Sequence, residues 1–155
     1  MNNLIELGYT KNILLLPENL KNLIQNQDWQ KLDKELEKLL KPKSQLDQTL
    51  KSYISFTKIE YITSVRDSKN PWEEDGIWHD DGSRVLAFSL SLNLDHEKVE
   101  GGKIGFRKKG HEESSILPVQ PFGTLIIFAT GNWGWEHKVY SVTKGLRVVM
   151  AGWCS

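Results

Sequence analysis

The sequence contains a single cysteine, Cys154, among its 155 residues. One cysteine excludes an internal disulfide and is typical of a reducing compartment, so we expect a cytoplasmic protein. Neither sign of charge prevails, because 20 Lys and Arg residues balance 20 Asp and Glu residues. This balance argues against a protein whose main task is to bind nucleic acid or an anionic membrane.

Long apolar segments are also missing. Runs such as residues 13–16 are far too short to span a bilayer, so we expect no membrane segment. Residues 1–6 lack a basic start followed by an apolar stretch, and we therefore expect no signal peptide. We find no internal repeat, low-complexity tract or linker. The length predicts a single domain over 1–155, with a helical part over about 1–50 and a β-rich core over about 53–155.

Two helices are predicted in the N-terminal part. The first sixteen residues indicate a short strand or an extended segment that ends at Pro17, which suits the first turn of a helix. A second helix is predicted over about 29–40, where apolar residues recur at helical spacing. Its apolar stripe is Trp29, Leu32, Leu36, Leu39 and Leu40.

Beyond residue 53, short apolar runs are separated by Gly, Asn and Asp, and no helical period persists. Many short strands at this spacing predict a β-sandwich or barrel. The predicted strands cover 53–65, 84–93, 103–107, 114–117, 124–129, 135–140 and 146–153. The long polar loop 67–76 is of a kind that is often functional.

His79, Asp81 and His137 are candidate metal ligands and catalytic residues. Residues i and i+2 of a strand point to the same face, so His79 and Asp81 can aim at one point while Asp80 faces away. A third ligand from another strand, His137, completes a two-histidine, one-carboxylate face. Such a face leaves coordination positions open and suits Fe(II).

The C-terminal half resembles the 2-oxoglutarate- and Fe(II)-dependent dioxygenases, particularly their prolyl-hydroxylase-like branch. The resemblance covers about 61–153 and depends on the order of several motifs. These are His79-x-Asp81, Arg84 before a strand that ends at Ser91-Leu92-Asn93, Gly101-Gly102, Pro121–Phe128, His137-x-Val139, Gly145-x-Arg147 and Trp153.

The resemblance implies a double-stranded β-helix, the jelly-roll or cupin-like fold, in a chain that is mainly β with N-terminal helices. It implies that His79, Asp81 and His137 bind Fe(II), and that Arg147 binds the distal carboxylate of 2-oxoglutarate. A guanidinium suits that role because it can hold a carboxylate with two charge-assisted hydrogen bonds. The implied reaction consumes O2 and 2-oxoglutarate, releases succinate and CO2, and hydroxylates a C–H bond, with ascorbate as an optional reductant.

A second anchor for 2-oxoglutarate is not assigned by the resemblance. Many relatives have a tyrosine at the position of Ser91, and others have a hydroxyl two or four residues after the arginine, where this chain has Val149 and Ala151. The candidates in this sequence are Tyr61, Ser89 and Ser91.

The candidates for the substrate pocket are Trp72, Arg84, Trp135 and Trp153. The expected substrate is a protein side chain or a small molecule. Two alternatives remain open at this point: a jelly-roll binding module that keeps the pocket without chemistry, and a cupin-like metalloenzyme of another reaction type. His96 and His111 lie in polar turns, and we expect both to be solvated.

Overall fold

The computed structural model describes residues 2–155, which form four α-helices, two 3-10 turns and ten strands. The helices are α1 (Asn2–Leu7), α2 (Asn19–Gln25), α3 (Trp29–Lys38) and α4 (Gln45–Lys51), and the turns are η1 (His96–Lys98) and η2 (Gly131–Trp133). The strands are β1 (Tyr9–Ile13), β2 (Ile59–Arg66), β3 (Leu86–Ser91), β4 (Glu100–Gly101), β5 (Ile104–Lys108), β6 (Ser115–Leu117), β7 (Thr124–Phe128), β8 (Trp135–Val139), β9 (Val142–Lys144) and β10 (Arg147–Cys154).

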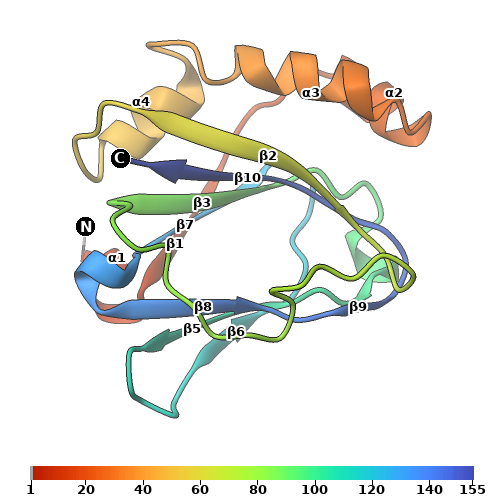
Figure 1. Ribbon diagram of the computed structural model, residues 1–155. Coiled ribbons are helices and arrows are strands. Elements are labelled where there is room, and N and C mark those ends of the chain that lie inside the picture. The colour runs from red at the N-terminus through yellow and green to blue at the C-terminus, as the bar shows by residue number, and fades with distance from the viewer. Residues whose placement is uncertain (1) are drawn as a thin grey trace.

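Two antiparallel sheets face each other (Figure 1). The larger sheet has the order β1-β7-β3-β10-β2, and the smaller has the order β6-β5-β8. Strands β4 and β9 form a separate short pair. The predicted arrangement, mainly β with a jelly-roll core, is confirmed.

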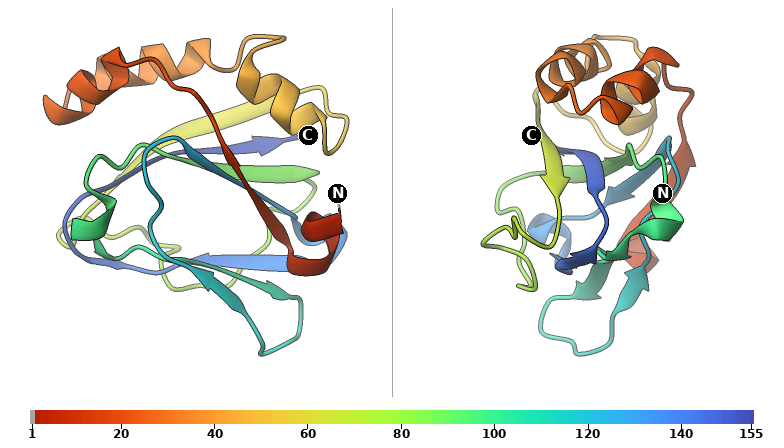
Figure 2. Two further views of the ribbon diagram at one scale, coloured as in Figure 1. Left: turned by 180° about the vertical axis from the view of Figure 1, so that it is seen from behind. Right: turned by 90° about the vertical axis from the view of Figure 1, so that its right-hand side faces the viewer.

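A layer of helices covers the outer face of the larger sheet (Figures 1 and 2). Apolar side chains from α2, α3 and α4, including Leu20, Leu36 and Leu50, are fully buried and join one core cluster with Met150 of β10. Both predicted helices are confirmed, although the second ends at Lys38. The layer protects the apolar face of the sheet, and the opposite face remains available for a site.

Alternation along β10 separates the two faces of the larger sheet. Val148 and Met150 belong to the core under the helices. Arg147, Val149 and Trp153, which alternate with them, line a cavity between the sheets. The sheet therefore presents polar chemistry on one face and apolar packing on the other.

The N-terminal segment agrees with its prediction only in part, because the predicted short strand is present as β1 but a helix precedes it. Residues 2–7 form a helix that buries Leu4, and β1 adds to the larger sheet beside β7. The structure also contains α4, β4 and β9, which the sequence pattern did not predict. At α4 a local signal was present: the Ser44 hydroxyl accepts a hydrogen bond from the Asp47 backbone N–H, which caps the helix.

Candidate metal and cosubstrate site

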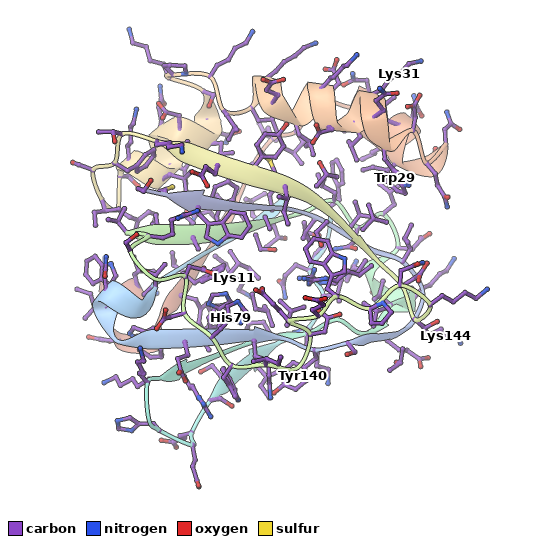
Figure 3. The ribbon with its side chains drawn as sticks, in the orientation of Figure 1. Lys11, Trp29, Lys31, His79, Tyr140 and Lys144 are labelled. Carbon is purple, nitrogen blue, oxygen red and sulfur yellow. The ribbon has the colours of Figure 1, made fainter. Side chains whose placement is uncertain are left out.

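Two histidines are brought together by backbone pairing. The backbone N–H of His79 donates to the carbonyl of His137 over 3.0 Å. In return, the backbone N–H of His137 donates to the carbonyl of His79 over 2.9 Å. This antiparallel bridge puts both side chains on the same side, with ring centroids 4.3 Å apart. His79 lies in the space between the two sheets (Figure 3). The segment around His79 is extended, and it is also held to β8 by the Gly76 backbone N–H, which donates to the Val139 carbonyl over 2.8 Å.

Asp81 completes the cluster from a turn that follows His79. The backbone N–H of Arg84 donates to the Asp81 carbonyl over 3.3 Å and closes this turn. The Asp81 carboxylate lies 3.9 Å from His79 Nε2 through Oδ1 and 3.5 Å from His137 Nε2 through Oδ2. One donor atom from each of the three residues lies within 4.8 Å of the others. The cluster could therefore hold one cation.

The hydrogen bonds and the burial of these side chains fit a metal. His79 Nδ1 lies 3.0 Å from the Ile77 carbonyl, which orients the ring and directs Nε2 toward the cluster. Within residues 2–155, Asp81 Oδ2 is buried without a hydrogen-bond partner. A buried carboxylate oxygen is costly unless something compensates its charge. Two imidazoles and one carboxylate are a donor set that suits Fe(II).

The expected protonation states of His137 and Asp81 also favour a bound metal ion. Burial, followed by the charge of His79, lowers the pKa of His137 to about 3, so its imidazole is neutral at physiological pH. Burial raises the pKa of Asp81, and the nearby His79 opposes this shift. A neutral imidazole and a poorly solvated carboxylate gain from a cation that replaces lost solvation.

Arg147 lies in the wall of the same cavity, whose volume is about 400 Å³. The residue is 4% exposed, and its Nε donates to the Gly102 carbonyl over 3.0 Å. Among the residues that the structure describes, Nη1 has no hydrogen-bond partner. Burial, followed by the charge of Arg66, lowers the pKa of Arg147 to about 9. A buried guanidinium with an unpartnered N–H group is stabilised when it binds an anion.

Gly102 makes room for this guanidinium. Its backbone has a φ of +62°, and a Cβ at this position would lie 2.8 Å from Arg147 Cδ. A side chain would be strained by the backbone and would crowd the arginine. The glycine therefore allows the Arg147 side chain to lie close to the backbone, and its carbonyl accepts the hydrogen bond from Arg147 Nε.

The three candidates for the second cosubstrate anchor lie in different places. Ser89 lines the cavity from β3. The Ser91 hydroxyl donates to the Gln120 carbonyl over 2.6 Å. Tyr61 lies on the helix side of β2, where its hydroxyl donates to the Asp33 carbonyl over 3.0 Å. Tyr61 does not reach the cavity, and its prediction as an anchor is wrong.

Three of the four substrate-pocket candidates line the cavity, namely Trp72, Arg84 and Trp153. Arg84 is held in an ion pair with Glu60 at 2.8 Å. Trp135 is buried and packs against Gly8, where a Cβ would lie 2.4 Å from its ring. Trp135 therefore belongs to the core, and the prediction that it lines the pocket is wrong.

Three polar residues of β2 that line the cavity were not predicted from the sequence, namely Glu60, Ser64 and Arg66. Arg66 stacks its guanidinium on Trp72 at 4.2 Å, and its Nε lies 3.5 Å from Asp75 Oδ1. A signal was available, because Glu60, Ser64 and Arg66 recur at even spacing, which puts polar side chains on one face of a strand.

The residues expected outside the site lie outside it. Asp80 faces away and forms an ion pair with Lys109 at 2.7 Å. His111 is exposed in its turn. No helix within residues 2–155 is long and apolar enough to cross a membrane.

Solved structures with similar folds include several prolyl hydroxylases. A prolyl-4-hydroxylase from Pseudomonas putida has a TM-score of 0.64 and 17% identity, over 99% of this chain and 90% of that one. A prolyl hydroxylase from Trichoplax adhaerens, in complex with a peptide of the hypoxia inducible factor oxygen degradation domain, has a TM-score of 0.65 and 13% identity, over 99% and 86%. A prolyl 4-hydroxylase from Phytophthora capsici has a TM-score of 0.63 and 15% identity, over 98% and 60%. These likenesses show the fold. No match was found among curated protein sequences.

The model of the 2OG-Fe(II) oxygenase superfamily matches residues 66–155, which is more than half of the chain. The matched range contains His79, Asp81, His137 and Arg147. Membership implies Fe(II), 2-oxoglutarate and O2 as the reaction's cofactor and cosubstrates, as the sequence predicted. The chain therefore belongs to the 2OG-Fe(II) oxygenase superfamily.

Proposed function

We propose that this chain is an active Fe(II)- and 2-oxoglutarate-dependent hydroxylase, and that His79, Asp81 and His137 hold its iron. The observation that carries the proposal is the convergence of their three donor atoms within 4.8 Å, with a buried and unpartnered Asp81 oxygen among residues 2–155. Bound Fe(II) supplies the redox chemistry that couples decarboxylation of 2-oxoglutarate to hydroxylation of a C–H bond.

The chain's own residues orient the reactants and keep water out. Arg147 binds the distal carboxylate of 2-oxoglutarate through its unpartnered Nη1, while its Nε remains fixed on the Gly102 carbonyl. The Phe128 ring packs 4.7 Å from the ring of His137 and shields it from solvent. A shielded site of fixed geometry favours reaction over side reactions with water.

The proposed substrate class is a prolyl side chain of a peptide. This is supported by the likeness of the fold to prolyl hydroxylases and by two indole rings, those of Trp72 and Trp153, in the cavity wall. Flat apolar rings suit a pyrrolidine ring. A small molecule is the second candidate, because about 400 Å³ lies within the usual range for small-molecule pockets.

Succinate release tests catalysis. The purified chain, supplied with Fe(II), 2-oxoglutarate and air, is expected to release succinate, and more of it when a proline-containing peptide is added. His79→Ala is expected to lower the rate at least 100-fold, since loss of one ligand disrupts the metal site. Asp80→Ala is the matched control, because Asp80 is the neighbouring carboxylate that faces Lys109. A His79→Ala rate equal to that of the parent contradicts the proposal.

Mass spectrometry of the peptide tests the substrate. A prolyl hydroxylase adds one oxygen atom to the peptide, and the product disappears when alanine replaces the proline. Binding of 2-oxoglutarate that is unaffected by metal, together with no succinate under any condition, would instead favour a binding module without chemistry.

A further inference from the structure

Two arginines lie directly opposite each other in the wall of the cavity. Arg66 of β2 pairs in register with Arg147 of β10, and directly opposed residues of an antiparallel pair point to the same face. The two residues are 8% and 4% exposed. Like charges in this relation repel each other, so the arrangement needs an anion nearby.

One buried carboxylate meets this need in part. Asp75 Oδ1 lies 3.5 Å from Arg66 Nε, and the Asp75 side chain is 3% exposed. Glu74, the next acidic residue, is 74% exposed and is screened by solvent. Two guanidinium charges against one buried carboxylate leave one positive charge uncompensated in this part of the wall.

A buried hydroxyl lies beside this charge. Ser64 is two residues before Arg66, on the same face of β2, and pairs in register with Val149. Ser64 is therefore the diagonal neighbour of Arg147 on the sheet. It is 1% exposed, and its Oγ has no hydrogen-bond partner in the part of the chain that the structure describes. A buried hydroxyl without a partner is stabilised by an acceptor for its hydrogen.

We infer that Ser64 and Arg66 form, together with Arg147, the anchor for the distal carboxylate of 2-oxoglutarate. The inference rests on the proposed function and adds two residues to it. One carboxylate supplies the missing negative charge, and its oxygens accept hydrogen bonds from the Ser64 hydroxyl and from both guanidinium groups.

The loop before His79 holds Arg66 in position. The Trp72 ring lies 4.2 Å from the Arg66 guanidinium, and Asp75 Oδ2 accepts a hydrogen bond from the Trp72 backbone N–H over 3.0 Å. Stacking on the Trp72 indole and pairing with the Asp75 carboxylate hold the Arg66 side chain in one conformation before the ligand binds. The side chain therefore loses less conformational entropy on binding. Trp72 and Asp75 are positioning residues for Arg66.

The other hydroxyls of the site are less well placed for this carboxylate. Ser89 pairs in register with Ala151, four residues along β10 from Arg147. The Ser91 hydroxyl already donates to Gln120. Ser64 is therefore the hydroxyl next to the arginine pair.

Calorimetric titration of the Mn(II)-loaded chain with two acids tests the inference. One acid is 2-oxoglutarate, and the other is 2-oxopentanoate, which has the same carbon chain and 2-oxo acid head but a methyl group in place of the distal carboxylate. The parent is expected to prefer 2-oxoglutarate. Ser64→Ala is expected to weaken 2-oxoglutarate binding about tenfold and Arg66→Gln more than tenfold, with 2-oxopentanoate binding unchanged, because each loses a hydrogen bond to a charged group.

Thr63→Val is the matched control. Thr63 precedes Ser64 on β2, and its hydroxyl donates to Asp33 on the helix side, away from the cavity. Its loss is expected to leave the affinity for both acids unchanged. Thermal melting of each variant checks its fold, and if Arg66→Gln does not fold, Ser64→Ala decides the question alone.

Three results separate the inference from the proposed function. If the parent prefers 2-oxoglutarate but Ser64→Ala leaves that preference unchanged, the inference is overturned and the proposed function stands. If Ser89→Ala and not Ser64→Ala causes the selective loss, the inference is overturned in the same way. If the parent binds neither acid, or binds both equally, both proposals fail.

Discussion

His137 is a titratable residue that the fold holds almost completely out of water. Its side chain is almost fully buried, the Phe128 ring packs on it, and its pKa is lowered to about 3, chiefly by burial. A histidine that stays neutral below pH 5 can donate a lone pair to a metal over the whole physiological range. The same burial makes protonation costly in the metal-free protein.

Stability of the metal-free chain is therefore expected to fall as the pH falls below 6.5. The unfolded chain takes up a proton on His137 near its ordinary pKa of 6.5, whereas the folded chain does not until about pH 3. Because the unfolded state binds more protons in this window, the free energy of unfolding decreases as the pH decreases, by up to about 1.4 kcal/mol per pH unit. Urea unfolding with a chelator present, at several values between about pH 7 and pH 5, measures this slope.

The variant His137→Gln is expected to show a shallower slope, and His111→Gln, at an exposed turn, is the matched control. Asp81 has a raised pKa and acts in the opposite direction at lower pH, so the comparison is made between variants. Equal slopes for the parent and His137→Gln would mean that His137 is not the group responsible.

For single residues, the chemical role could be predicted from the sequence better than the direction in which the side chain points. The His79-x-Asp81 spacing, His137 and Arg147 could be identified because few other roles suit those residue types in that order. Tyr61 was misassigned because neighbouring residues of a strand face opposite sides, and only the register of β2 decides which side faces the cavity.

Among the secondary-structure elements, the strand β10 connects the site to the core. It pairs with β2 on one edge and β3 on the other, and it carries Arg147 and Trp153 into the cavity. Gly152 lies opposite Phe88 on the core face, and a Cβ there would lie 2.2 Å from the Phe88 ring. The close packing of β10 on β3 therefore depends on a glycine at this position.

Gly152→Ala is expected to destabilise the fold by about 1–3 kcal/mol, because the added methyl group overpacks a core that cannot expand. Gly105→Ala is the control, since a Cβ there meets the outer end of the Trp78 ring at 3.1 Å. Chemical denaturation measures both variants. A Gly152→Ala variant as stable as the parent would show that β3 and β10 are packed less tightly than the structure indicates.

The elements that could be predicted are those with long or regular patterns. The α3 helix has an apolar stripe, and β3, β7 and β10 are short segments in which apolar residues predominate. The short elements β4 and β9 have two and three residues, so neither contains enough alternation to be recognised. Tertiary pairing, which is absent from local sequence, determines such elements.

The whole molecule is two facing sheets with a helix layer on one of them (Figure 1). Helix residues such as Leu36 are in the same buried cluster as Met150 of β10. We propose that residues 1–155 fold as one domain, as the length and composition predict. The helices and the β-rich core are then expected to unfold together.

Leu36→Ala tests this proposal. It removes a fully buried side chain from the helix layer and is expected to cost about 2–5 kcal/mol. Helical circular dichroism and tryptophan fluorescence are expected to give coincident transitions in the parent and again in the variant, with the midpoint of the variant lowered in both signals. A helical transition that precedes the fluorescence transition would instead indicate two separate units.

The central claim is that residues from two segments of the fold converge on one metal ion. Titration of the metal-free chain with Mn(II), followed by electron paramagnetic resonance of the free ion, tests it most directly. The parent and Asp80→Ala are expected to bind one ion per chain with equal affinity. The variants His79→Ala, Asp81→Ala and His137→Ala are each expected to bind at least tenfold more weakly, because each loses a ligand. Equal binding by all three variants and the parent would contradict the account.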